Sequence, residues 1–172
     1  EVRPEFKVIV SSATINTKAF SAYFNNAPIV SIDARLHPVD IVYRPLSNPN
    51  DPDELFSSIT TIVERHASAK AGDVLVFLPG EFDIKTCVQH LMASKAKRNL
   101  VIDPLFGRLS KEEQEKVFLP TPAGKTKVVV ATNIAETSVT IDGITAVIDS
   151  GIAKINYYNQ RDFTSSLVSL PV

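Results

Sequence analysis

Short apolar runs recur along the chain and predict strands. Three of them, Lys7–Val10, Val74–Leu78 and Val128–Ala131, are aliphatic at both odd and even positions. Residues that are apolar on both alternating faces are typical of a parallel strand that is covered on both sides. Val101–Ile102 and Ala146–Ile148 are shorter candidates. We therefore expect a sheet that is buried on both faces.

Helical periodicity fills the stretches between these runs. Asp51 suits an N-cap, Pro52 the first helical position and Glu54 the third position after the cap, and Gly72 marks the end. Apolar or aromatic positions at helical spacing follow the cap at Leu55, Phe56, Ile59, Ile62, Val63 and His66. This pattern predicts an amphipathic helix that packs on the sheet.

Three further helices are predicted. One starts near Gly80, and another is capped by Ser110 with Glu113 three residues on and Pro120 after its end. The helix from Gly80 has one apolar face, formed by Ile84, Cys87, Val88, Leu91 and Met92. An aromatic trio suggests a short helix after Thr14, at Phe20, Tyr23 and Phe24.

The order of these elements indicates the fold class. Strands that alternate with helices favour βαβ units, because parallel strands need crossover connections. The end of the chain differs, since Ala153–Tyr158 and Ser166–Leu170 have the pattern of an antiparallel hairpin. Arg44–Asn50, with its two prolines, is expected to be a loop or linker.

Composition narrows the class of protein. The 172 residues are 44% hydrophobic and 22% charged, which is typical of a globular domain. The net charge of −1 excludes a strongly basic, histone-like mode of nucleic-acid binding. No run approaches 18 apolar residues, so we expect no membrane span. The single cysteine favours a reducing compartment, and the missing initiator Met suggests a piece of a longer protein.

Several features with possible chemistry have a simpler interpretation. Gly124-Lys125-Thr126 matches the end of a phosphate-binding loop, but Leu119 stands where the first glycine belongs, so we expect a plain turn. The cations Lys95, Lys97 and Arg98 suit the solvated last turn of a helix. The histidines lack partners at metal-ligand spacing, so we expect no metal site at His37, His66 or His90.

Two polar runs directly follow predicted strands. Thr132–Gly143 is dense in hydroxyls, and Ser12–Thr14 is shorter. In an open parallel sheet, ligands bind beyond the carboxyl ends of the strands. The same residue types also cap helices. On the residues alone, both interpretations stay open.

The longer run carries a family resemblance. Lys127–Gly143, which reads KVVVATNIAETSVTIDG, closely resembles motif V of the DEAH-box (DEAH/RHA) RNA helicases. Ser12–Thr14 resembles motif III, Leu75–Gly80 motif IV and Pro104–Leu109 the motif that follows it. Val147–Gly151, with Lys154, Tyr158, Asn159 and Arg161 after it, is similar to the segment and hairpin that follow motif V.

The resemblance implies a fold and a domain division. It implies an α/β, RecA-like three-layer domain with a mostly parallel sheet and a C-terminal β-hairpin. Residues 1–40 would be the end of a first RecA-like domain, with its motif III strand and a linker. Residues 41–172 would be the second RecA-like domain, truncated before motif VI. The phosphate loop and the DEAH motif would lie upstream.

It also implies an activity for the parent protein. That protein would be an ATP-dependent RNA helicase, which couples hydrolysis of ATP or another NTP, with Mg²⁺, to 3′-to-5′ translocation and to RNA unwinding or RNP remodelling. It would act inside the cell, in cytoplasm or nucleus, on single-stranded RNA, with a G-patch-type activator as a further partner. The fragment alone would retain no nucleotide and hydrolyse no ATP. The alternative is a non-catalytic RecA-like module that binds RNA or protein.

Residue roles follow from the same resemblance. Ser12 and Thr14 would couple hydrolysis to strand separation. RNA would be contacted by Thr132, Asn133, Gly80 and Arg108. The nucleotide would be contacted by Ser138, Thr140, Asp142 and Ile152. Ile152 stands where many members place a Phe that stacks on adenine, so we expect weak base selectivity.

Overall fold

The computed structural model describes residues 7–10, 16–31, 38–48, 51–133, 140–159 and 164–171. It divides into two compact units, Glu1–Tyr43 and Arg44–Val172. The units are described separately below. The predicted domain boundary between residues 40 and 41 stays a prediction, because a division by contacts does not identify what either unit is.

A short helix lies in the first unit, as the aromatic trio predicted. Helix α1 (Thr17–Tyr23) is capped by Asn16, whose side chain accepts a hydrogen bond from the Ala19 N–H at 3.2 Å. The strand predicted at Lys7–Val10 is wrong, since these residues have no regular structure and the Ile9 side chain is 92% exposed. A strand needs a hydrogen-bonding neighbour, and the described residues of this unit provide none.

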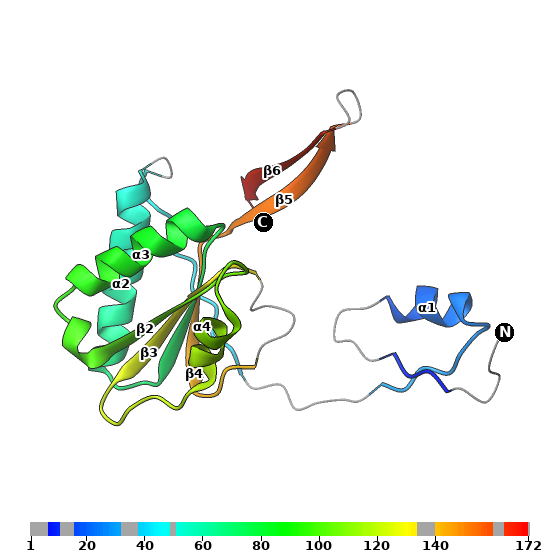
Figure 1. Ribbon diagram of the computed structural model, residues 1–172, viewed down its shortest axis with the longest axis horizontal. Helices are drawn as coiled ribbons and strands as arrows, with labels where there is room; N and C mark the ends of the chain where they lie inside the picture. Colours follow the sequence, from blue (N-terminus) through cyan, green and yellow to red (C-terminus); the bar gives the residue numbers. More distant parts are fainter. Residues whose placement is uncertain are drawn as a thin grey trace. The chain divides into compact units, whose positions relative to one another are not determined.

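The second unit is built on a parallel sheet of four strands in the order β2-β3-β1-β4 (Figure 1). The strands are β1 (Asp73–Phe77), β2 (Leu100–Leu105), β3 (Thr126–Ala131) and β4 (Ile144–Asp149). The central strand β3 is buried along its whole length. The four predicted strands of this unit are therefore confirmed, with β2 and β4 longer than expected.

Helices cover the sheet on both faces (Figure 1). On one face, α2 (Pro52–Ser68) and α3 (Glu81–Ala93) pack against the even-numbered residues of β1 and β3. On the other face, Val117 packs against Val129 and Ala131; it belongs to the short pair α4 (Lys111–Glu115) and η2, a 3-10 turn (Lys116–Phe118). Each fully buried valine or leucine side chain contributes about 1.5–3 kcal/mol, so the two packed faces stabilise the sheet from both sides.

The helix caps agree with the sequence in part. Asp51 accepts from the Asp53 N–H at 3.0 Å, and Ser110 with Glu113 forms a complete capping box. Glu54 does not return to its own cap. It accepts from the backbone N–H groups of Ser47 and Asn48, at 2.6 and 2.7 Å. These two hydrogen bonds connect the preceding segment to the first turn of α2.

Helix α3 ends before the three cations that were expected in its last turn. It ends at Ala93, so Lys95 follows the helix, and Lys97 and Arg98 begin η1 (Lys97–Asn99), exposed to solvent. Met92 is 57% exposed, because at 3.6 residues per turn it lies at the edge of the apolar stripe of α3. Cys87 is fully buried in that stripe, and burial raises the pKa of its thiol to about 12. Its predicted role in packing is confirmed.

The last two strands form the predicted hairpin. Strand β5 (Ile152–Asn159) pairs antiparallel with β6 (Thr164–Pro171), and Lys154 lies opposite Ser169. The hairpin starts three residues after β4 ends, so its root lies at the carboxyl edge of the sheet. No helix in the described ranges is long and apolar enough to cross a bilayer.

Candidate nucleic-acid interface

All four strands of the sheet end at one edge, because they run parallel. The loops that leave this edge begin at Leu78, Phe106, Thr132 and Ser150. The strand-end rule for open parallel sheets makes this edge the first place to look for a ligand.

Backbone hydrogen bonds hold these loops in register beyond the strands. The N–H of Leu78 donates to the Ala131 carbonyl at 2.9 Å, and the N–H of Thr132 donates to the Leu105 carbonyl at 3.2 Å. On the outer side, the N–H of Ser150 donates to the Phe77 carbonyl at 3.3 Å. The first residue of each loop is thus fixed by a neighbouring strand, which preorganises the edge.

The structure brings the four predicted RNA residues to this edge. Arg108 follows β2, Thr132 and Asn133 follow β3, and Gly80 follows β1. The three strands are neighbours in the sheet. Arg108 and Asn133 are exposed, Thr132 is half-buried and Gly80 is buried. The set therefore offers a guanidinium, an amide and a hydroxyl at one edge of the sheet.

An acid in the first turn of α3 organises the charges here. The Glu81 carboxylate accepts from Lys85 Nζ at 2.7 Å and lies 3.8 Å from the Arg108 guanidinium. The hydrogen bond from Lys85, with the positive charges of Lys85 and Arg108, lowers the pKa of Glu81. The Arg108 side chain is 88% exposed, and exposed ion pairs are worth little. Arg108 can therefore exchange Glu81 for an incoming phosphate at low cost.

The predicted nucleotide residues do not gather in one place. Thr140 and Asp142 precede β4, whereas Ile152 follows it. The six residues of β4 span about 20 Å, so these positions lie at opposite edges of the sheet. Asp142 and Thr140 are exposed, and Ile152 is 38% exposed. Ser138, Ser12 and Thr14 lie outside the described residues.

The remaining sequence candidates have ordinary surroundings. Gly124 lies in an exposed turn with a φ of +78°, as predicted from the missing first glycine of the phosphate-loop pattern. His66 Nε2 lies 3.0 Å from Thr145 Oγ1, and His90 Nε2 lies 3.8 Å from Asp53. Within the described ranges, no group of three His, Cys, Asp or Glu side chains could hold a metal ion. His37 lies outside those ranges.

Sequence reasoning missed a buried polar cluster at the opposite, amino edge. Asp73, 7% exposed, accepts from the Lys127 N–H at 2.8 Å and from Thr121 Oγ1 at 2.5 Å. Lys127 is 3% exposed, and its ammonium donates to the carbonyls of Val117 and Leu119. In the sequence, the sign of this cluster is a charged residue, Lys127, directly before the apolar run of β3. Every polar group named here is bonded within the protein, so this cluster is structural.

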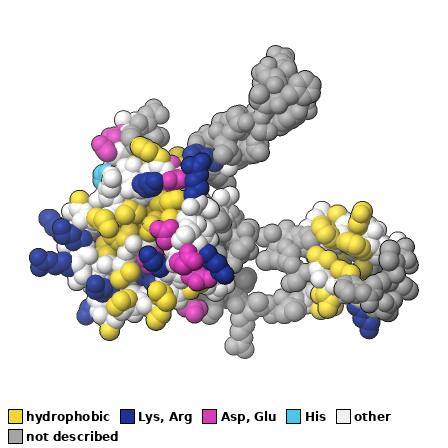
Figure 2. Space-filling model, in the orientation of Figure 1, with side chains coloured by type: hydrophobic (Ala, Val, Ile, Leu, Met, Phe, Trp, Pro, Cys, Tyr) yellow, Lys and Arg dark blue, Asp and Glu magenta, His cyan; other side chains and the backbone are white. Residues whose placement is uncertain are grey.

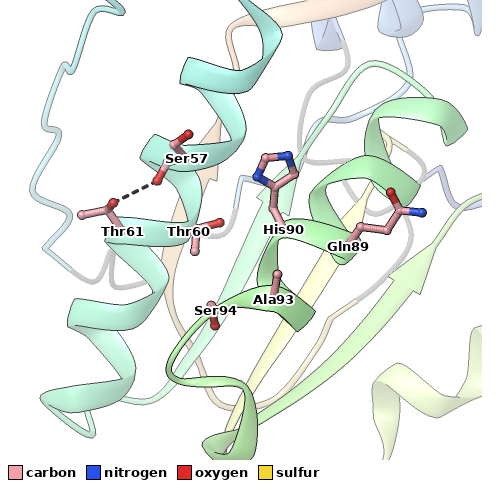
Figure 3. A pocket seen from close by; sticks show the side chains of 7 residues that line it. All are labelled: Ser57, Thr60, Thr61, Gln89, His90, Ala93 and Ser94. Atoms are coloured by element: carbon pink, nitrogen blue, oxygen red, sulfur yellow. Dashed lines mark hydrogen bonds between the residues drawn. The ribbon is translucent and has the colours of Figure 1, made fainter.

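A shallow groove of about 510 Å³ lies between α2 and α3 (Figure 3). Its lining residues are Ser57, Thr60, Thr61, Gln89, His90, Ala93 and Ser94. Thr60 and Thr61 donate their hydroxyl protons to the carbonyls of Phe56 and Ser57, at 2.8 and 2.9 Å. None of the predicted site residues lines this groove, which is formed by the helices that cover the sheet.

Comparisons with known proteins identify the relatives of this chain. The pattern of the helicase conserved C-terminal domain matches residues 54–163. The chain is 47% identical over 170 residues to the ATP-dependent RNA helicase HrpA of Borreliella burgdorferi, covering 99% of this chain and 21% of that protein. It is 39% identical over 170 residues to the HrpA homolog of Haemophilus influenzae, covering 99% of this chain and 13% of that protein.

Two solved structures have the same fold. The DEAH/RHA helicase HrpB of Escherichia coli matches with a TM-score of 0.79 and 34% identity, over 93% of this chain and 20% of that one. A second structure, of the E. coli DExH-box NTPase HrpB, gives a TM-score of 0.76 and 31% identity, over 93% of this chain and 19% of that one. This chain therefore spans about a fifth or less of the length of these proteins. The matches confirm the predicted RecA-like α/β fold.

Proposed function

Because the chain belongs to the helicase conserved C-terminal domain family, in its DEAH/RHA branch, we propose that it is the RNA-gripping part of an ATP-dependent RNA helicase. Residues 41–172 form the second RecA-like domain, and residues 1–40 are the end of the first. The observation that carries the proposal is the carboxyl edge, where Arg108, Thr132 and Gly80 follow three neighbouring strands.

This edge suits the sugar-phosphate backbone of a single strand. Most protein contacts to nucleic-acid backbones come from arginine, hydroxyl, amide and main-chain N–H groups, and these carry no sequence information. Thr132 supplies the hydroxyl, Asn133 the amide and Arg108 the guanidinium. Neutral donors hold phosphate without raising the net charge, which agrees with a total of −1. The substrate is therefore single-stranded RNA, bound without strong sequence preference.

We place the nucleotide at Thr140 and Asp142, which are exposed before β4 and can form hydrogen bonds with a ribose or an ordered water. Ile152 follows β4, about 20 Å away, and the base and ribose of one nucleotide are joined directly, so Ile152 does not share this set of contacts. Bound ATP with Mg²⁺ supplies the phosphoryl-transfer chemistry. The described residues contain no phosphate cradle, so the chain alone hydrolyses no ATP.

Unwinding follows from closure of two RecA-like lobes on ATP and reopening after hydrolysis. ATP favours the closed state through contacts that exist only there. Ser12 and Thr14 couple the two events, while Thr132 contacts RNA phosphate and Ser138 contacts the nucleotide. The direction is 3′ to 5′, the work is RNA unwinding or RNP remodelling inside the cell, and a G-patch-type protein serves as activator.

A second candidate function is a non-catalytic module that binds RNA or protein. The hydroxyl-rich run after β3 favours the enzyme, because a scaffold gains nothing from so many polar groups beyond a strand end. The discriminating experiment measures ATP hydrolysis by the complete protein with and without single-stranded RNA. We expect strong stimulation by RNA. No hydrolysis in either condition, from a well-folded protein, would establish the binding module instead.

A further inference from the structure

The backbone conformation at position 80 does not require a glycine. Gly80 has φ −165° and ψ 172°, an extended conformation that any residue adopts. The atoms around position 80 explain why a glycine is found there. A Cβ built at position 80 would meet the Lys154 ammonium first, then Lys154 Cε at 3.2 Å and Asp83 Oδ2 at 3.4 Å. The head of the Lys154 side chain therefore occupies the space that a side chain at position 80 would fill.

Lys154 reaches this place from another element. It lies near the start of β5, at the root of the hairpin, whereas Gly80 is the N-cap of α3. Its side chain is exposed, and within the described ranges no carboxylate lies within 4.0 Å of its ammonium. The two other cations nearby, Lys85 and Arg108, share the Glu81 carboxylate. Figure 2 shows basic side chains beside acidic ones at the root of the hairpin.

We propose that Lys154 binds a phosphate of the RNA strand, and that the absence of a side chain at Gly80 leaves room for its ammonium. The inference rests on the proposed function and extends it to the fourth strand. Arg108, Thr132, Gly80 and Lys154 follow β2, β3, β1 and β4, in their order in the sheet. A candidate contact to the RNA backbone, or the space for one, thus follows each of the four strands.

The chemistry of lysine fits this place. An ammonium on a flexible stem is a point charge that binds phosphate oxygens without demanding one geometry. A strand that slides past the site needs such an undemanding contact, whereas a bidentate arginine fixes one register. Because Lys154 belongs to β5, the same contact also ties the hairpin root to the bound strand.

The first test compares two lysines in the complete protein. Binding of a fluorescent single-stranded oligouridylate is measured by anisotropy over a range of salt concentrations. Lys154→Ala is expected to lower the affinity about 3- to 10-fold and to reduce the slope of log K against log salt by about 0.7 to 1. Lys125→Ala, an exposed cation before β3 at the other edge, is the matched control and should change neither quantity.

The second test addresses the space at position 80. Gly80→Ala pushes the ammonium from its seat, so its loss of affinity should match that of Lys154→Ala. The double variant Gly80→Ala, Lys154→Ala should then bind as well as either single variant, since both remove one contact. Additive losses would mean that the two positions act independently, and the proposed link between them would be wrong.

The outcomes separate this inference from the proposed function. If the wild-type protein binds the oligonucleotide and Lys154→Ala binds with the same affinity and salt slope, the inference is overturned while the function stands. If the wild-type protein binds no RNA, both are overturned. Should Gly80→Ala fail to fold, as judged by circular dichroism, Lys154→Ala alone decides, because its side chain is on the surface.

Discussion

Polar side chains at the two edges of the sheet differ in burial and in hydrogen bonding. At the amino edge, Asp73 and Lys127 are buried, and their polar groups are bonded to protein partners. At the carboxyl edge, Asn133, Arg108 and Lys154 are exposed, and the Arg108 guanidinium lies 3.8 Å from the Glu81 carboxylate. The difference teaches how to separate a structural polar residue from a functional one.

The physical reason is the cost of burial. A buried donor or acceptor without a partner costs about 1–3 kcal/mol, so the amino edge must satisfy its own groups. Exposed groups are satisfied by water, and a ligand can replace that water at little cost. The buried cluster of Asp73 and Lys127 at the amino edge therefore stabilises the sheet, whereas the exposed groups at the carboxyl edge are available for binding.

The largest expected effect is on Asp73. Asp73→Ala leaves the Lys127 N–H and the Thr121 hydroxyl without their acceptor, so we expect the free energy of unfolding to fall by about 2–4 kcal/mol. Asp149→Ala is the control at the other end of the sheet, where the exposed carboxylate accepts from the Gly151 N–H at 2.8 Å. It should cost less than about 1 kcal/mol in urea denaturation. Equal losses would erase the distinction between the edges.

Two threonines offer the next test. Thr132→Ala should weaken RNA binding about 5- to 10-fold, or about 1 kcal/mol, with little change in melting temperature. Thr145 Oγ1 donates to the Ala71 carbonyl at 2.6 Å, so Thr145→Ala should lower stability by about 1 kcal/mol and spare RNA affinity. Fluorescence anisotropy and thermal melting of both variants check the pair. The reverse pattern would count against the proposed interface.

Asp103, in the middle of β2, is the third test, because its carboxyl is partly buried. Burial raises the pKa of its carboxyl, against the opposing positive charges of Lys127 and Lys116. A pKa above the unfolded value means that stability present at low pH is lost as the pH rises through the folded pKa. Asp103→Asn should therefore gain less than about 1 kcal/mol near pH 8 and nothing below about pH 4. Melting temperatures at both pH values decide, and a loss near pH 8 would refute the burial argument.

The smallest effect is expected at Glu54, which is exposed and yet bonded. Hydrogen bonds from the backbone of Ser47 and Asn48 lower the pKa of Glu54. The stability that they contribute is present above the ordinary pKa and is lost as the pH falls through the lowered value. Glu54→Ala should speed amide hydrogen exchange at Ser47, with no change in global unfolding. Unchanged exchange would show that this segment is held by other contacts.

Much of this arrangement could be predicted locally. The caps at Asp51 and Ser110, the apolar faces of α2 and α3 and the strands of the second unit all follow from neighbouring residues, and the structure has them. The strand-end rule places Thr132 at a ligand edge from the sequence pattern alone. Local pattern was sufficient because secondary structure and binary patterning are set within a few residues.

The failures share a cause. Lys7–Val10 has a strand pattern and no strand, because pairing depends on a neighbour that the pattern does not contain. Glu54 has the spacing of a capping box, yet it binds Ser47 and Asn48, because the preceding segment turns back along α2. Both outcomes depend on chain segments that lie elsewhere.

The sequence by itself determined the family, the alternation of strands and helices and the motif residues, because these are properties of consecutive positions. Only the tertiary structure decided which polar residues are bonded and which are available. It seated Lys154 at Gly80, 74 positions apart in the chain, and it placed Asp142 and Ile152 at opposite ends of β4. Such neighbours are created by strand order and burial, and neither is written in the spacing of residues along the chain.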